Sequence, residues 1–181
     1  VNGLAPLFVD SGGHQTLNAD VDIVLEQLER EDVCGVILAH TLGFPYDAKR
    51  IREKCDWLDK WFVEDCCDSL GAYIADKNNE KIGEWTGQFG HLSTLSFFPA
   101  HHITTGEGGA VCTNYGRLSR LVNSYRDWGR DCWCGPGQDD TCGKRYGWKL
   151  GDLPEGYDHK NIYSHIGFNL KMTDFQAAIG S

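Results

Sequence analysis

The sequence contains no cluster of basic residues and no long apolar run. Its 181 residues carry a formal net charge of −9, from 17 Lys and Arg against 26 Asp and Glu. A nucleic-acid surface needs clustered Lys and Arg, so we expect no nucleic-acid partner. No apolar stretch approaches the roughly 20 residues that a membrane-spanning helix requires, and no signal peptide is visible. The sequence therefore predicts a cytoplasmic protein without a membrane partner.

Internal repeats and low-complexity tracts are also absent. Hydrophobic residues make up 41 % and charged residues 24 % of the sequence, which is typical of one globular domain with a core of its own. Both ends look internal to a longer chain. Val1 is not a methionine, and Ser181 follows what reads as the first turns of a helix over 173–179. We expect an internal piece of a longer protein.

Apolar residues follow two patterns along the chain. In some segments they recur at helical spacing, and in others they run continuously, as in strands that are buried on both faces. Helices are predicted after a cap at Asn18 or Asp20, after Asp47, around 118–125 and over 173–179, and strands over 33–39, 61–65, 94–98 and 110–113. This alternation is typical of a mostly parallel α/β sheet covered by helices.

Two segments interrupt the alternation. Residues 76–88 are polar and turn-like, and we expect them in an exposed excursion around Asn78–Lys81. Residues 129–163 are rich in Gly, Cys, Trp and charge, and they are too many for a passive connection. We expect the second segment to be functional.

The eight cysteines do not indicate a disulfide scaffold, because such scaffolds are usually shorter and denser in cysteine. Cys34 and Cys112 lie in apolar runs, where we expect small core residues. Cys55 falls in a helical pattern and has no obvious partner.

The other cysteines are better interpreted as metal ligands. Cys132, Cys134 and Cys142 have the spacing C-x-C-x7-C, which lets one loop deliver several thiolates to a metal. A 2Fe–2S cluster needs a fourth ligand, for which Cys67 is the natural candidate and Cys66 the second choice. Four cysteines also satisfy a structural zinc ion, and spacing alone favours zinc at least as much.

Polar residues follow one predicted strand end. Ligands of open α/β sheets gather beyond the carboxyl ends of strands, and Asp65 and Asp68 stand there. Taken alone, an Asp in this place is more often a loop residue or a helix cap. Taken alone, the adjacent His101 and His102 also fit a structural turn.

Four segments in order along the chain change these interpretations. They resemble the DegT/DnrJ/EryC1/StrS sugar aminotransferase family. The segments are His-Thr-Leu-Gly at 40–43, Val-Glu-Asp-Cys-Cys-Asp-Ser-Leu-Gly at 63–71, Ser-Phe-Phe-Pro-Ala-His-His-Ile-Thr-Thr-Gly-Glu-Gly-Gly at 96–109, and Gly-Phe-Asn-Leu-Lys-Met-Thr-Asp at 167–174.

This resemblance implies the large domain of the aspartate-aminotransferase type (PLP fold type I), with a mixed, mainly parallel sheet. Residues 1–181 would be its central part, with a cysteine-rich loop at about 129–163, and the N-terminal segment and the small C-terminal domain would be missing. Asp65 would pair with the pyridinium nitrogen of pyridoxal or pyridoxamine 5'-phosphate, which keeps the ring an electron sink. Ser96 would donate to the cofactor phosphate, and Asp68 and His102 would also contact the cofactor.

The lysine that binds the cofactor covalently in such aminotransferases is absent. Counting along Ser-Phe-x-Pro-x leads to His101 instead. Imidazole cannot hold the cofactor covalently, so the cofactor would be bound as pyridoxamine phosphate. A histidine has an unperturbed pKa of about 6.5 and can act as a general base, and we assign that role to His101. The histidine pair resembles the 3-dehydrase branch of the family.

That branch implies reductive C3 deoxygenation of a nucleotide-linked 4-keto-6-deoxyhexose, with a CDP-sugar as first choice, for dideoxysugars such as those of lipopolysaccharide. The segments at 126–134, 141–145 and 153–160 resemble it too, and they imply a 2Fe–2S cluster on Cys67, Cys132, Cys134 and Cys142. The excursion near residues 78–81 lengthens the spacing between Cys67 and the other three. Electrons would come from an NADH-dependent flavin, iron–sulfur reductase, and the full-length protein would be a homodimer.

Two other functions compete with this one. A cluster-free 3-dehydratase for GDP-4-keto-6-deoxymannose would share His101 but would not need the three loop cysteines. A non-catalytic protein on the same fold would use the cysteines for zinc, and the persistence of Asp65 and Ser96 counts against it.

Overall fold

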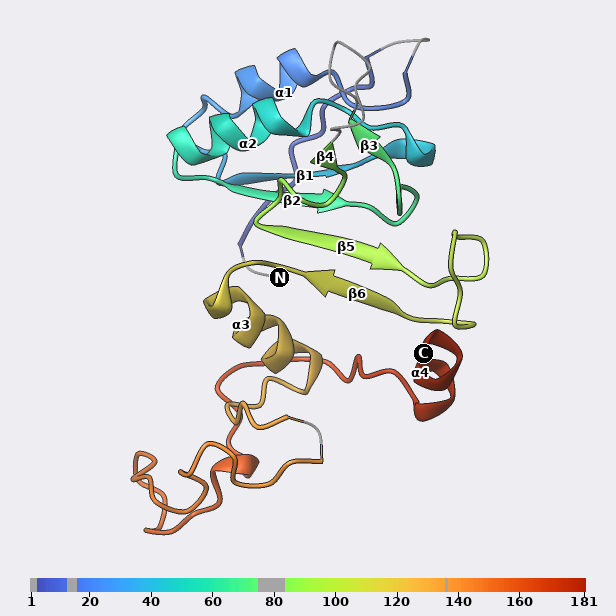
Figure 1. The fold of residues 1–181 in the computed structure, drawn as a ribbon. Coiled ribbons are helices and arrows are strands. Elements are labelled where there is room, and N and C mark those ends of the chain that lie inside the picture. Colours follow the sequence, from blue (N-terminus) through green and yellow to red (C-terminus); the bar gives the residue numbers. More distant parts are fainter. Residues whose placement is uncertain (1–2, 13–15, 75–83, 136) are drawn as a thin grey trace. The chain divides into compact units, whose positions relative to one another are not determined.

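The computed structural model describes residues 3–12, 16–74, 84–135 and 137–181. The chain divides into two compact units (Figure 1): unit 1 is Val1–Asn114 with Phe175–Ser181, and unit 2 is Tyr115–Asp174. The predicted excursion at 78–81 lies outside the described residues. Within those residues, no helix is both long enough and apolar enough to pass through a lipid bilayer.

Two helices of unit 1, α1 and α2, are capped as the sequence predicts. In α1 (Val21–Gln27) the Asp20 carboxylate accepts from the backbone N–H groups of Asp22 and Ile23. In α2 (Ala48–Trp57) the Asp47 carboxylate accepts from the N–H of Arg50. Each cap satisfies donors that a helix start leaves free, which is why the chain turns into a helix at these residues.

The main sheet of unit 1 is mixed and mainly parallel, which confirms the predicted fold class. Its order is β1-β2-β5-β6, with β1 at Gly35–Ala39, β2 at Trp61–Asp65, β5 at Leu92–Ser96 and β6 at Gly109–Cys112. The first three strands are parallel and β6 is antiparallel. A short antiparallel pair, β3 (Tyr73–Ile74) and β4 (Glu84–Trp85), stands apart.

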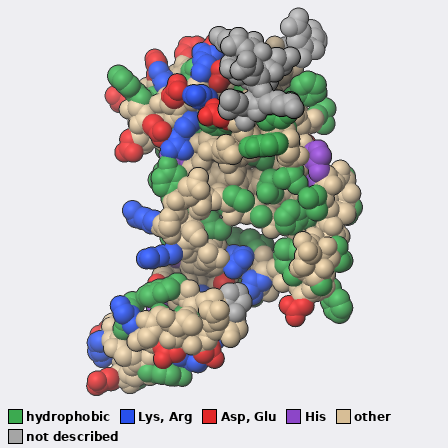
Figure 2. All heavy atoms as spheres, in the orientation of Figure 1, with side chains coloured by type: hydrophobic (Ala, Val, Ile, Leu, Met, Phe, Trp, Pro, Cys, Tyr) green, Lys and Arg blue, Asp and Glu red, His purple; other side chains and the backbone are tan. Residues whose placement is uncertain are grey.

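The core of unit 1 lies between the helices and one face of the sheet. Val24 of α1, Ile51 and Cys55 of α2, and Phe62 of β2 are all buried in one cluster. Figure 2 shows the outer side of this layer at the upper left, where charged side chains of both signs gather over the helices. Ion pairs on these helices are Arg50–Asp22, Lys54–Glu29 and Arg52–Asp56.

The prediction of a first strand buried on both faces is wrong for β1. Val36 and Leu38 pack against the core, whereas Ile37 is 72 % exposed. Successive side chains of a strand point to opposite faces, and α1 and α2 cover only the face of Val36 and Leu38. The prediction of core positions for Cys34 and Cys112 is also wrong, because both are exposed.

Strand β5 also ends earlier than predicted. Its ladder stops at Ser96, where the N–H of Phe98 donates to the Ser96 hydroxyl at 3.2 Å. Beyond it, the N–H groups of Phe97 and Thr105 form loop hydrogen bonds to Gly108 and Phe97. Pro99 has no N–H to offer a ladder, so the chain leaves the sheet here.

Unit 2 contains the predicted helix α3 (Gly116–Arg126) and a long irregular segment after it. The segment's regular elements are a short 3-10 helix, η2 (His159–Asn161), and two isolated bridges, Asp127–Asn169 and Arg130–Tyr163. Bidentate pairing of Arg145 with Asp158 and an ion pair of Lys171 with Asp127 tie distant parts of it together. The described chain closes with α4 (Asp174–Gly180), as predicted.

Candidate functional site

Asp65 is the last residue of β2, as the sequence predicts for the cofactor carboxylate. Its Oδ1 accepts from the backbone N–H of Cys67 at 3.0 Å and from the Thr94 hydroxyl at 3.2 Å. Thr94 is the register partner of Asp65 in β5, so parallel pairing brings the two side chains together. Burial opposes the charge of Asp65, but hydrogen bonds from Cys67 and then Thr94 hold its pKa below the usual range. The carboxyl group is therefore ionised, as pairing with a pyridinium requires.

Glu64 and His40 form a fully buried network behind Asp65. The Glu64 carboxylate accepts from the backbone N–H groups of Gly87 (2.9 Å), Phe89 (2.8 Å) and Gly90 (2.5 Å), and from His40 Nε2 at 3.0 Å. His40 Nδ1 accepts from the N–H of Tyr46 at 3.4 Å, and its own backbone N–H donates to the Asp65 carbonyl at 3.0 Å. The network fixes the turn that leads into β5, and so fixes Thr94 beside Asp65.

His40, Glu64 and Cys66 are the one group of possible metal ligands, among the described residues, whose ligand atoms all lie within 4.8 Å of one another. Both Glu64 oxygens are occupied by N–H donors. Burial, and next the charge of Glu64, raise the pKa of the Cys66 thiol to about 12. A neutral thiol and a saturated carboxylate do not make a metal site, so this group is structural.

His101 contacts Asp68, and the sequence did not predict this contact. His101 Nε2 lies 3.2 Å from Asp68 Oδ1, and the ring packs edge-on against Phe98 at 5.8 Å. His101 Nδ1 is buried and has no hydrogen-bond partner among the described residues. With Nε2–H directed at a carboxylate, the lone pair of a neutral ring lies at Nδ1, which is the atom free to accept a proton.

The turn at Gly43 approaches the Asp68 backbone closely. A Cβ atom on Gly43, whose φ is +81°, would lie 2.8 Å from the Asp68 carbonyl oxygen, so only glycine allows this approach. Ser96 is the last residue of β5 and is half-buried, whereas His102 is exposed. Ser96 is thus available to a phosphate, and His102 shows no contact that sets it apart from a turn residue.

Cys66 and Cys67 differ in accessibility. Cys66 is 1 % exposed and belongs to the His40–Glu64 group, whereas Cys67 is half-buried. Cys67 Sγ lies 3.8 Å from the Thr94 hydroxyl. Burial and then a hydrogen bond to Asp65 raise the pKa of the Cys67 thiol. Of the two neighbours, only Cys67 presents its sulfur outside the core.

In unit 2, the Cys134 thiol interacts with both of the other loop cysteines that the sequence singled out, Cys132 and Cys142. The side chain of Thr141, and next the backbone N–H of Cys142, lower the pKa of the Cys134 thiol to about 6. Burial raises the pKa of Cys132. The donor set fits a thiolate-bound metal, because one sulfur is already stabilised as a thiolate at neutral pH.

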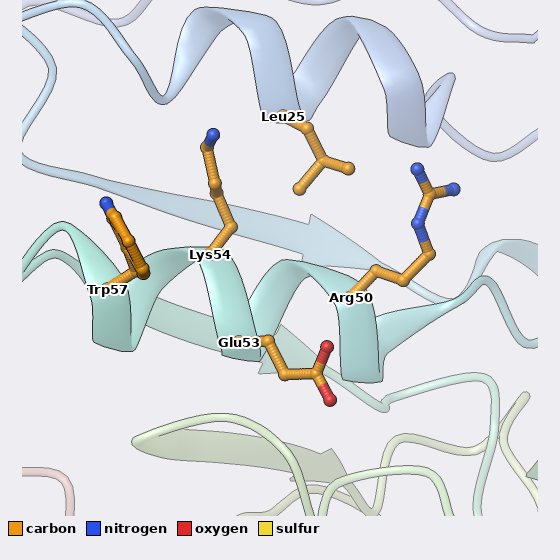
Figure 3. Close-up of a pocket in the computed structure, with 5 residues that line it drawn as sticks. All are labelled: Leu25, Arg50, Glu53, Lys54 and Trp57. Carbon is orange, nitrogen blue, oxygen red and sulfur yellow. The ribbon is translucent and has the colours of Figure 1, made fainter.

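An open depression on the α1–α2 layer is unrelated to this chemistry (Figure 3). It is lined by Leu25, Arg50, Glu53, Lys54 and Trp57. Its two cations are engaged, since Arg50 pairs with Asp22 at 2.7 Å and Lys54 with Glu29 at 2.6 Å. We assign no function to it.

Comparison with known proteins gives consistent matches. The model of the DegT/DnrJ/EryC1/StrS aminotransferase family matches residues 1–181. The chain is 50 % identical over 99 % of its length to the lipopolysaccharide biosynthesis protein RfbH of Salmonella typhimurium. It is 49 % identical over 98 % of its length to the dTDP-4-dehydro-2,6-dideoxy-D-glucose 3-dehydratase of Saccharopolyspora spinosa. It spans only 39 % and 37 % of these two proteins.

Among solved structures, the chain is similar to the E. coli GDP-4-keto-6-deoxy-D-mannose-3-dehydratase with bound hydrated PLP. The TM-score is 0.69 at 25 % identity, over 96 % of this chain and 40 % of that one. The likeness supports the predicted fold type.

Proposed function

Since the chain belongs to the DegT/DnrJ/EryC1/StrS aminotransferase family, we propose that it is the central part of a pyridoxamine-phosphate-dependent sugar 3-dehydrase. The observation that carries the proposal is the environment of His101. An imidazole stands where a transaminase needs a lysine, its Nε2 is held by Asp68, and its buried Nδ1 is free to take a proton. Two similar proteins are named 3-dehydratases, which supports the same reaction class.

We assign each candidate site residue of unit 1 a role in cofactor binding or proton transfer. Bound pyridoxamine phosphate supplies an amine for the 4-keto group of the sugar and a ring that takes up electrons. Asp65, ionised and held by Thr94, pairs with the ring nitrogen. Ser96 donates to the phosphate. His101 Nδ1 would take up a proton beside the bound cofactor, while Asp68 keeps the Nε2–H in place.

The substrate we propose is a nucleotide-linked 4-keto-6-deoxyhexose, with CDP-4-keto-6-deoxyglucose first. A relative that is 50 % identical is a lipopolysaccharide biosynthesis protein, which supports a role in surface dideoxysugars. The other close relative acts on a dTDP-sugar by name. The nucleotide preference is therefore tested by measuring turnover of the CDP-, dTDP- and GDP-linked sugars in parallel.

Loss of the C3 hydroxyl leaves a product that must receive two electrons. We propose that Cys132, Cys134, Cys142 and Cys67 hold a 2Fe–2S cluster that delivers these electrons one at a time. The grouping of the three loop thiols and the accessibility of Cys67 support this ligand set. An NADH-dependent flavin, iron–sulfur reductase would reduce the cluster again after each turnover. The full-length protein would work as a cytoplasmic homodimer.

The test of the catalytic assignment uses His101→Asn in the full-length protein, with His102→Asn as the matched control. We expect His101→Asn to abolish solvent exchange of the C4′ proton while the cofactor still binds, and His102→Asn to retain the exchange. Borohydride should trap no cofactor on the wild-type protein. Unchanged exchange in His101→Asn, or a covalent cofactor adduct, would refute the assignment.

The cluster-free GDP-sugar dehydratase is the second candidate, because the similar solved structure is such an enzyme. It predicts full turnover without iron and without an electron donor. The grouped cysteines of unit 2 argue against it, since that reaction has no use for them.

A further inference from the structure

His159 is a fully buried imidazole in the unit that carries the cysteine loop. Its side chain is 0 % exposed. Nε2 lies 2.6 Å from Asp131 Oδ2, and the other oxygen of Asp131 accepts from the Ser164 hydroxyl at 2.6 Å. The backbone N–H of His159 donates to the Arg145 carbonyl at 2.8 Å. These contacts hold the ring in one orientation.

The second nitrogen of this ring lacks a hydrogen-bond partner in the part of the chain that the structure describes. His159 Nδ1 is buried and makes no hydrogen bond to any described residue. A buried polar atom without a partner costs on the order of tenfold to a hundredfold in the folding equilibrium, so native proteins rarely leave one. The buried Nδ1 of His159 is therefore expected to bind a group that the described residues do not supply.

The surroundings of His159 connect it to the cysteines. Its ring packs against Trp133 at 5.6 Å and Trp148 at 4.8 Å. Trp133 stands between Cys132 and Cys134 in the chain, and Asp131 immediately precedes Cys132. An indole offers a donor but no acceptor, so neither Trp can accept from Nδ1. The imidazole thus packs against the tryptophan that separates Cys132 from Cys134 in the chain.

We propose that His159 Nδ1 donates a hydrogen bond to a sulfur atom of the cluster that the cysteine loop holds, and thereby raises its reduction potential. The proposal rests on the proposed function. With Asp131 accepting from Nε2, donation from Nδ1 requires a proton on both ring nitrogens, and thiolate and sulfide sulfurs are acceptors. Hydrogen bonds to cluster sulfurs are among the protein's means of setting the potential.

Two substitutions separate donation at Nδ1 from the contact with Asp131. In His159→Asn the amide nitrogen takes the place of Nδ1, and in His159→Gln it takes the place of Nε2. His165→Gln is the matched control: His165 lies in the same unit, and its Nε2 lies 3.2 Å from the Ser124 hydroxyl. The full-length proteins are reconstituted anaerobically with ferrous iron and sulfide, and the potential is followed by electron paramagnetic resonance.

We expect His159→Gln to lower the ratio of reduced to oxidised cluster about tenfold at a fixed potential, which is about 59 mV for one electron. His159→Asn should restore most of the wild-type ratio, and His165→Gln should leave it unchanged. An unchanged potential in iron-loaded His159→Gln would overturn the proposal.

A measurement on the wild-type protein covers the case in which the variants fail to load. The full-length protein is made with nitrogen-15-labelled histidine, and we expect a hyperfine coupling between that nitrogen and the reduced cluster. A cluster without this coupling overturns the role of His159 alone. A wild-type protein that takes up zinc and no cluster overturns the proposed redox function instead.

Discussion

Glu64→Gln tests the buried network that places Asp65 in the site. The wild-type carboxylate receives N–H groups from Gly87 and His40 on one oxygen, and from Phe89 and Gly90 on the other. A glutamine has one acceptor oxygen and one amide donor, so in either orientation two buried N–H groups face another donor. Each such group costs about 1–3 kcal/mol, which gives a loss of about 2–6 kcal/mol in the free energy of unfolding.

The effect should depend on pH in a definite direction. Burial raises the pKa of Glu64, but hydrogen bonds from His40, Gly87 and Gly90 outweigh it and bring the pKa below the ordinary value of 4.5. A depressed folded-state pKa contributes stability that is present above the unfolded pKa and is lost as pH falls through the folded pKa. The difference between wild type and variant should therefore be largest near neutrality and shrink below about pH 4.

The assay is urea unfolding of the full-length protein at pH 7 and at acid pH. Glu53→Gln is the matched control, because the same chemical change on the exposed face of α2 should stay within about 0.5 kcal/mol. A Glu64→Gln protein as stable as the control at pH 7 would show that the network is not what holds the turn at 87–90. A difference that persists at low pH would show that the carboxylate charge is not involved.

Three further substitutions test the site itself. Thr94→Val removes the hydroxyl that donates to Asp65, so equilibrium titration should show that pyridoxamine phosphate binds about tenfold more weakly. Thr94→Ser should restore the wild-type affinity. Equal affinities in the wild type and both variants would contradict the role of Thr94. Asp68→Asn removes the charge beside His101, so turnover should fall about 10- to 100-fold while the affinity for the cofactor is unchanged. A loss of cofactor affinity alone would show that Asp68 binds the cofactor instead. Cys134→Ser should lose most of the bound iron in a colorimetric assay, whereas Cys112→Ser, which alters an exposed thiol of β6, should keep it; equal iron in both would refute the ligand assignment.

Local signals were enough to predict most of the fold. Asp20 and Asp47 begin the helices that they were predicted to cap, and β2 matches its predicted range at Trp61–Asp65. The errors concern burial and the bounds of β5, which was predicted over 94–98 and spans Leu92–Ser96. Cys34 and Cys112 lie in apolar runs yet are exposed, because a sequence pattern does not reveal which face of a strand its neighbours cover.

The site was only partly predictable for a similar reason. Asp65, Asp68 and His101 were identified from the sequence, but Thr94 was not. The contacts of Asp65 with Thr94 and of His101 with Asp68 were not predicted, since they depend on strand register and loop closure. The register pairs Asp65 with Thr94, and a pairing of the predicted strands 61–65 and 94–98 could have suggested it. Nothing in the sequence marks His159 Nδ1 as a buried atom without a partner, because that property exists only once the chain folds.

The most direct test of the redox dehydrase is a metal analysis of the full-length protein, purified without oxygen, together with its absorption spectrum. We predict a brown protein with visible charge-transfer bands and about two iron and two sulfide per chain, as a 2Fe–2S cluster requires. A colourless protein with about one zinc ion per chain would contradict the account, since four thiolates also satisfy zinc and zinc carries no electrons.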